Sequence, residues 1–183
     1  RRLFYDLSVY ESERSSIFHN CWMYVAHESQ IPNPGDFVAS YMGEEPVVVS
    51  RAADGAIHVL VNSCSHRGTK VCRAQEGNAS TFTCPYHGWK YSNEGRLLGV
   101  PYSSSYQGTL DKSAWGLNRA AKVDQCFGLI FATFDAEAVP LHDYLGADLI
   151  GYMETIFGRS EAGVRMQGGA NRWCIDCNWI VPV

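Results

Sequence analysis

The chain has 183 residues, 46% of them hydrophobic, and its 15 basic and 19 acidic residues give a formal net charge of −4. This length and composition are typical of one compact globular unit with minor additions. The sequence has no basic run that would bind nucleic acid and no apolar run of about 18 residues that could cross a membrane, so neither partner is expected.

In chain order, the predicted elements form a mainly β, antiparallel domain with short flanking helices. A helix is expected from Val9 to Asn20, leading into Trp22. From Asp36 onward, short runs of β-branched and aromatic residues alternate with turn residues, which predicts strands at 47–49, 56–61, 81–83 and 127–134.

The remaining elements follow Pro140. Apolar residues there recur at helical spacing as far as Gly158, and this helix is expected to close the β-domain. The positions concerned are Leu141, Tyr144, Leu145, Leu149, Tyr152 and Ile156. The segment from Gly163 to Val183 predicts two strands joined near Gly168-Gly169, with Trp173, Ile175, Trp179 and Val181 as apolar positions.

Two short segments each pair a cysteine with a histidine: Cys64-Ser-His66 and Cys84-Pro-Tyr-His87. Together they offer two thiolates and two imidazoles, the ligand set of a Rieske [2Fe-2S] cluster. Replacing two of four thiolates by neutral histidines lowers the negative charge of such a cluster and raises its reduction potential. We therefore expect both cysteines to bind one iron and both histidines to bind the other, which takes the electron.

A zinc site is the alternative, since two cysteines and two histidines are also a common zinc ligand set. Zinc knuckles usually pair Cys with Cys and His with His, whereas each segment here carries one of each. A chain this long and apolar can also bury its own core without a zinc staple. The sequence therefore favours the cluster, and metal content would decide between the two.

The residues next to these ligands suit exposed loops. Gly68 and Gly88 lack a Cβ and would let backbone N–H groups approach the cluster sulfurs, while Pro85 stiffens the second loop. We expect the two loops to be hairpin tips of one small sheet, close enough to the surface for the histidines to be accessible.

Longer stretches carry a resemblance to a known family. Cys64–Gly68 and Cys84–Trp89 resemble the large subunit of Rieske non-haem iron aromatic-ring-hydroxylating dioxygenases. Trp22–Phe37 and Gly128–Phe131 are similar to that family's first and last Rieske segments, and Asn178-Trp179 begins its Asn-Trp-Lys motif, with Ile180 in place of the lysine. The resemblance implies these cluster-binding residues: Cys64, His66, Arg67, Gly68, Cys84, Tyr86, His87, Gly88 and Trp89.

The resemblance also implies three parts of the chain. Residues 1–36 would be an N-terminal helical segment that packs with the catalytic domain, and residues 37–158 the Rieske [2Fe-2S] domain. Residues 159–183 would supply the first strands of an α+β catalytic domain. The family's iron-binding stretch, Asp-x-x-His-x4-His, would begin beyond Val183, so we expect a truncated catalytic domain and no catalytic residue in this chain.

For the complete subunit, the resemblance implies that electrons pass from NADH through a reductase, often with a ferredoxin, to the cluster and then to a mononuclear Fe(II). That iron would use O2 to convert an aromatic hydrocarbon, with a leaning toward naphthalene and larger fused rings, into a cis-dihydrodiol. Three large subunits, commonly with three small β-subunits, would form the assembly. The alternative function is a stand-alone Rieske ferredoxin-type carrier, which would not need the helices or Asn178-Trp179.

A comparison with respiratory Rieske proteins suggests a low potential. Those proteins tie their loops by a disulfide, at positions occupied here by Thr69 and Tyr86, and place a serine at the position of Trp89. Without the serine hydroxyl, the oxidised cluster is relatively favoured, although Tyr91 is a possible remaining donor.

The other histidines and cysteines are expected to be structural. No two of the histidines at 19, 27, 58 and 142 stand with a carboxylate at facial-triad spacing, and adjacent helical residues such as His142 and Asp143 point in different directions. Cys21, Cys72 and Cys126 are expected to be buried small hydrophobes. Cys174 and Cys177 would face opposite sides of a strand. A labile cluster favours a reducing compartment, so the expected location is the cytoplasm.

Overall fold

A computed structural model describes residues 2–168 and 175–181. Within these residues the strands form three small antiparallel sheets, with the spatial orders β1-β10-β9, β4-β3-β2-β5 and β6-β7-β8. The strands are β1 (Met23–His27), β2 (Asp36–Met42), β3 (Glu45–Arg51), β4 (Ile57–Val61), β5 (Glu76–Asn78), β6 (Thr81–Thr83), β7 (Lys90–Ser92), β8 (Leu97–Gly99), β9 (Lys122–Cys126) and β10 (Leu129–Thr133). The expected mainly β, antiparallel fold is confirmed.

The helical elements are short, apart from one. They are η1 (Arg2–Phe4), α1 (Leu7–Glu13), η2 (Arg14–Phe18), η3 (Glu28–Gln30), η4 (Ser103–Tyr106), η5 (Lys112–Trp115) and α2 (Leu141–Phe157). None of the helices in the described part of the chain has the length and apolarity needed to cross a membrane.

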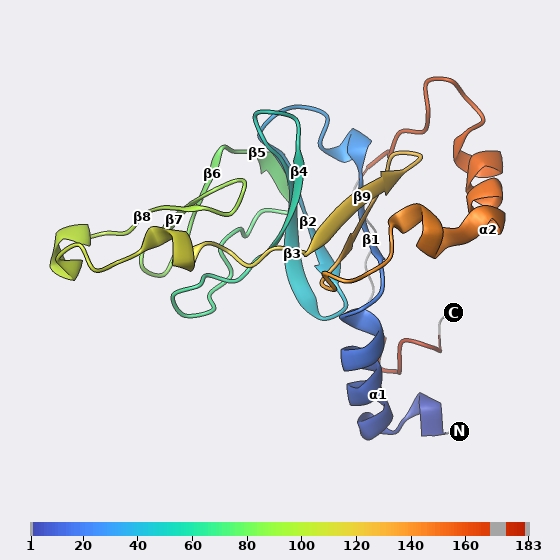
Figure 1. Cartoon of the computed structure of the whole chain (residues 1–183), viewed down its shortest axis with the longest axis horizontal. Coiled ribbons are helices and arrows are strands. Elements are labelled where there is room, and N and C mark those ends of the chain that lie inside the picture. The colour runs from blue at the N-terminus through green and yellow to red at the C-terminus, as the bar shows by residue number, and fades with distance from the viewer. Residues whose placement is uncertain (1, 169–174, 182–183) are drawn as a thin grey trace.

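The two faces of the central sheet β4-β3-β2-β5 cover two separate hydrophobic cores. On β3, Val47 and Val49 pack against Ile130 of β10, so one core lies between the central sheet and the β1-β10-β9 sheet. Val48, on the other face, packs with Phe82 of the β6-β7-β8 sheet. This alternation follows from the two-residue period of a strand, and it makes the central sheet the middle layer of the molecule (Figure 1).

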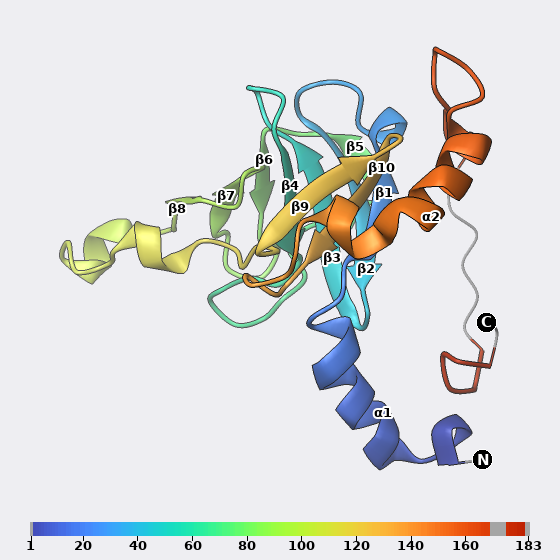
Figure 2. The same cartoon turned by 45° about the vertical axis from the view of Figure 1, so that its right-hand side comes forward.

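The N-terminal helix extends away from the layered body (Figures 1 and 2). It begins at Leu7, and Asp6 is its N-cap: the Asp6 carboxylate accepts a hydrogen bond from the Ser8 backbone N–H at 3.0 Å. Hydrogen bonds from the Ser8 hydroxyl and from Arg2 hold the pKa of Asp6 at about 2. The helix expected at 9–20 is therefore present, two residues earlier at each end, as α1 and η2.

The helix after Pro140 is present, but the face that it buries differs from the face that its spacing suggests. α2 packs on the β1-β10-β9 sheet through Leu141, Leu145, Met153 and Phe157, whereas Leu149, Tyr152 and Ile156 are exposed. The cause is Gly146, whose φ of 72° and ψ of 160° interrupt the helix and change its rotational phase. A single periodicity cannot describe two helical halves that are joined at a kink.

The two strands predicted between Gly163 and Val183 are wrong for the described part of that segment, because residues 163–168 and 175–181 form turns and irregular chain. Positions 169–174, including Trp173 and Cys174, lie outside the described residues. A strand needs a neighbouring strand for its hydrogen bonds, and here the bonds are local, such as Cys177 N–H to the Ile175 carbonyl. The end of the chain instead meets the N-terminal helices: Trp179 packs edge-on against Phe18 and donates to Glu13.

The division into 1–36, 37–158 and 159–183 stays a prediction. β1 (Met23–His27) pairs with β10 (Leu129–Thr133), so the first 36 residues contribute a strand to the body as well as the N-terminal helix.

Candidate iron–sulfur site

The two cysteine–histidine segments lie on loops of two different sheets. The first loop follows β4 of the central sheet, and the second joins β6 to β7. Only the second loop is a hairpin tip, so the expectation of two tips on one small sheet is wrong. Which sheet a short strand joins is decided by distant pairing partners, and local composition carries no signal for it.

The two loops nevertheless follow the same backbone path. The Cys64 N–H donates to the Thr69 carbonyl at 2.9 Å, and the Cys84 N–H donates to the Trp89 carbonyl at 2.8 Å. Each loop then closes on its cysteine, because the N–H groups of Gly68 and Gly88 donate to the carbonyls of Cys64 and Cys84.

Both glycines adopt the left-handed conformation, with φ of 72° at Gly68 and 71° at Gly88. This conformation is the structural reason for a glycine at each site, since L side chains are strained there. The N–H groups of the two glycines themselves serve loop closure, since each donates to a cysteine carbonyl.

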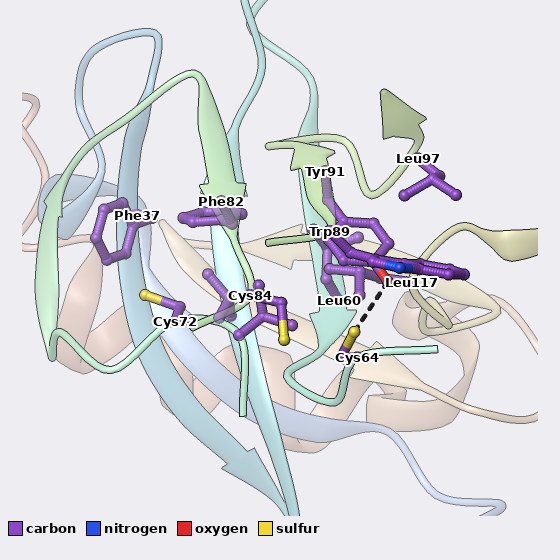
Figure 3. Close-up of a cluster of buried hydrophobic side chains, with 12 residues drawn as sticks. Phe37, Leu60, Cys64, Cys72, Phe82, Cys84, Trp89, Tyr91, Leu97 and Leu117 are labelled. Carbon is purple, nitrogen blue, oxygen red and sulfur yellow. Dashed lines mark hydrogen bonds between the residues drawn. The ribbon is translucent and has the colours of Figure 1, made fainter. Parts of the chain in front are cut away.

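The two loops meet at their histidines. The rings of His66 and His87 have centroids 4.7 Å apart. Cys64 and Cys84 are both buried in the core between the central sheet and the β6-β7-β8 sheet (Figure 3). The structure thus brings together two histidines that are separated in the sequence by β5 and β6 and the loops around them.

One ring nitrogen of His66 is buried and available to bind a metal. His66 Nδ1 is buried and has no hydrogen-bond partner. Burying a ring nitrogen without a partner is costly, and coordination to a metal removes that cost. Among the described residues, no three His, Cys, Asp or Glu side chains gather around one point.

A tyrosine hydroxyl reaches one of the sulfurs. The Tyr91 hydroxyl lies 3.2 Å from Cys64 Sγ, as the dashed line in Figure 3 shows. Tyr91 is fully buried, and burial first and the contact with Cys64 second raise the pKa of its hydroxyl. The hydroxyl therefore stays protonated and can donate to a thiolate, as the sequence suggested.

Aromatic side chains cover both histidines. The Trp89 indole stacks on His66 with centroids 4.8 Å apart and an angle of 7°, and the half-exposed Trp115 meets Trp89 edge-on. Tyr86 stacks on His87 at 3.8 Å.

Charge also acts on this outer side of the site. The guanidinium carbon of Arg67 lies 5.6 Å from the centre of the Tyr86 ring. Desolvation, followed by the charges of His66 and Arg67, lowers the pKa of His87. The lowered pKa favours the neutral form of His87, which is the form that binds metals.

Three contributors were not predicted from the sequence. Asn62 hydrogen-bonds both Val71 and Cys72, and the Ser65 hydroxyl donates to the Gly116 carbonyl at 2.5 Å, which fixes the segment that carries Trp115. In the sequence, the only feature that could have pointed to Asn62 and Ser65 is that they lie next to the expected ligands. Trp115 lies too far along the chain for any local pattern to place it here.

Most of the other histidines and cysteines are structural, as expected. Cys72 and Cys126 are buried, whereas Cys21 is only half-buried. His27 is a core residue whose Nδ1 is held by Ser29, yet its Nε2 is buried without a partner. The buried histidine thus has a hydrogen-bond partner for only one of its two ring nitrogens. The six cysteines in the described ranges are all free thiols.

Comparisons with known proteins agree on one region. Residues 21–117 match the family described as the Rieske [2Fe-2S] domain. The benzene 1,2-dioxygenase subunit alpha of Pseudomonas putida is 44% identical over 97% of this chain and 39% of its own length. The biphenyl 2,3-dioxygenase subunit alpha of Rhodococcus jostii (strain RHA1) is 45% identical over 97% of this chain and 38% of its own.

A solved structure gives the same result in three dimensions. The crystal structure of naphthalene 1,2-dioxygenase from Rhodococcus sp. bound to indole superposes with a TM-score of 0.90 at 45% identity, covering 97% of this chain and 40% of that one. The chain thus spans about 40% of the length of the proteins that it matches.

Proposed function

Because the chain belongs to the Rieske [2Fe-2S] domain family, we propose that its two ligand loops hold a [2Fe-2S] cluster that carries single electrons. Cys64 and Cys84 would bind one iron, and His66 and His87 the other. The observation that carries this assignment is the meeting of two imidazole rings, whose centroids are 4.7 Å apart, one of which has a buried nitrogen with no partner. When bound, the cluster supplies a centre that accepts and releases one electron.

The surrounding residues have separate tasks in this proposal. Trp89 excludes water from the face of His66 on which it stacks, and Tyr86 covers His87 with Arg67 beyond it. Gly68 and Gly88 shape the loops. Tyr91 donates a hydrogen bond to the sulfur of Cys64, which favours the more negative, reduced state.

For the whole protein, we propose the large subunit of an aromatic-ring-hydroxylating dioxygenase. The support is the 44% and 45% identity to subunits named for benzene and biphenyl dioxygenases over nearly all of this chain. Electrons from NADH would reach the cluster through a reductase and a ferredoxin. A mononuclear Fe(II), with ligands outside these residues, would then use O2 to cis-dihydroxylate an aromatic hydrocarbon.

The partners follow from the same proposal. The relatives are named as alpha subunits, which favours an assembly with small β-subunits, and we propose three of each. We place the protein in the cytoplasm, where reducing conditions preserve an iron–sulfur cluster. No observation favours the stand-alone carrier.

The ligand assignment is tested on the purified chain. We expect two irons and two acid-labile sulfides per chain, visible absorption, and a signal in electron paramagnetic resonance (EPR) after reduction. His87→Cys should leave a more negative, harder-to-reduce cluster or none, while His142→Cys, on the exposed side of α2, should match the native protein. An unchanged potential in His87→Cys, or a colourless protein that holds zinc, would overturn the assignment.

The oxygenase proposal needs a different test. The polypeptide is isolated from its source, and its mass is compared with the 20.4 kDa of this chain. A mass more than twice as large is expected, and the intact protein with reductase, ferredoxin and NADH should place both atoms of ¹⁸O₂ in a cis-diol of benzene, biphenyl or naphthalene. A mass equal to that of this chain would favour the carrier instead.

A further inference from the structure

The two ligand loops share one backbone path but are supported differently at their bases. The second loop, 84–89, closes the β6–β7 hairpin, and the paired residues Thr83 and Lys90 lie directly beneath it. The first loop, 64–69, follows β4, whose pairing with β3 ends at Val61. Residues 70–75 belong to no strand, so no ladder joins the two ends of the first loop.

One side chain spans the gap where the ladder is missing. Asn62 Oδ1 accepts hydrogen bonds from the Val71 N–H at 3.0 Å and the Cys72 N–H at 2.8 Å. Its Nδ2 donates to the Cys72 carbonyl at 2.8 Å. The backbone N–H of Asn62 donates to the Pro46 carbonyl of β3 at 2.7 Å, so the same residue is anchored to the central sheet.

Burial makes this arrangement specific. Asn62 is 2% exposed, and a buried amide keeps its orientation because any other one would leave its polar atoms without partners. An amide offers both a donor and an acceptor, which is what a neighbouring strand would offer to Cys72. Few side chains of this size could satisfy both groups at once.

We propose that Asn62 is a positioning residue for the cluster: its side chain replaces the missing ladder and fixes Cys64 and His66 relative to Cys84 and His87. This inference rests on the proposed function, since it concerns the ligands of the same cluster. A cluster bound from two loops needs both pairs of ligands at one set of relative positions. The hairpin sets one pair, and Asn62 sets the other.

The test begins with the native chain, whose iron and sulfide content decides whether a cluster is present at all. Asn62→Ala is then compared with Asn93→Ala. Asn93 is also a buried asparagine, 7% exposed; it follows the end of β7 opposite the second ligand loop, and its Nδ2 donates to the Arg51 carbonyl at 3.1 Å. We expect Asn62→Ala to broaden the EPR signal and shift the midpoint potential, or to lose iron, while Asn93→Ala keeps the native spectrum and potential.

A second measurement, amide hydrogen exchange, does not depend on a bound cluster. Hydrogen exchange of the Val71 and Cys72 amides should become about 10- to 100-fold faster in Asn62→Ala, and the Cys84 and Gly88 amides should be unchanged. Asn62→Asp keeps an acceptor for both N–H groups, so it should fold and show a smaller change at Val71 than Asn62→Ala. It serves as the folded variant if alanine does not fold.

The outcomes separate the two proposals. A native chain without iron overturns the cluster itself. A native chain with a cluster, together with Asn62 variants that keep its spectrum, its potential and the protection of both amides, overturns the role of Asn62 and leaves the cluster intact.

Discussion

At the scale of single residues, the hydrogen bond from Tyr91 to Cys64 Sγ connects the core with the redox chemistry. The hydroxyl is 3.2 Å from the sulfur and is shielded from water. Hydrogen bonds to ligand sulfurs favour the reduced cluster, which carries the extra negative charge. The residue that helps to fix the core should therefore also help to fix the potential.

Tyr91→Phe should lower the midpoint potential by about 60 mV, the one-electron equivalent of about 1.5 kcal/mol, which is the low end for a hydrogen bond to a charged group. Redox titration followed by EPR measures the shift. Tyr24→Phe is the control, because Tyr24 lies on β1 beside Phe131 and is half-exposed. Equal potentials in the Tyr91 variant and the native protein would show that the hydroxyl does not act on the cluster.

At the scale of elements, the match of the two ligand loops allows a matched pair of substitutions. Gly68 and Gly88 have nearly the same φ, so alanine should cost about 1–2 kcal/mol at either site from backbone strain. A Cβ on Gly88 would also lie 3.0 Å from the Pro101 Cγ atom, whereas at Gly68 the nearest atom is 3.8 Å away. Gly88→Ala should therefore lower the free energy of unfolding more than Gly68→Ala.

Urea denaturation measures both changes, and the double variant Gly88→Ala/Pro101→Ala separates their causes. If the contact with Pro101 is the source of the difference, the shortened residue 101 should bring the Gly88 variant close to Gly68→Ala. A Gly68 variant that is the less stable of the two would contradict this account.

The kink in α2 gives a second comparison between glycines. Gly146, at φ 72° and ψ 160°, occupies a region that is nearly restricted to glycine, so Gly146→Ala should destabilise the protein by about 1–3 kcal/mol. Gly151 lies in the same helix without a positive φ, and a Cβ there meets nothing within 4 Å. Gly151→Ala should stabilise the protein by about 0.5–1 kcal/mol. Thermal unfolding measures both variants, and we expect a lower unfolding temperature for Gly146→Ala and a higher one for Gly151→Ala. Stabilisation by both substitutions would mean that α2 can straighten at Gly146.

These elements also show where sequence-based prediction succeeds. The β-branched and aromatic runs of β3, β4, β6 and β10 were predicted, because burial on a sheet selects such residues. The sequence of β5 predicts no strand, because Gly77-Asn78 is a typical turn pair, and β5 is a strand only because it pairs with β2. The ligands were found from two short motifs, whereas Asn62 and Trp115 were missed, since their roles arise only where distant segments meet.

At the scale of the whole molecule, the body is made of successive layers, and each interface is closed by apolar side chains. The N-terminal segment differs, because η1 and α1 extend from this body (Figure 2). Leu3, Phe4, Tyr5 and Leu7 are close neighbours in the sequence, and we call them the N-terminal apolar patch; each side chain is between 49% and 77% exposed. Neighbouring exposed apolar side chains of this kind favour association, whereas isolated ones are common on monomers.

The N-terminal apolar patch therefore predicts concentration-dependent self-association of this chain. Phe4→Ser/Leu7→Ser should weaken it at least about tenfold, an effect of about 1.4 kcal/mol, which is less than the full burial of two such side chains would provide. Sedimentation velocity over a range of concentrations measures the change. Tyr102→Ser is the matched control, since Tyr102 is 85% exposed, far along the chain from the patch. If Tyr102→Ser weakens association as much as the double variant does, the association is non-specific and hydrophobic. If only the double variant weakens it, the N-terminal apolar patch is the contact surface.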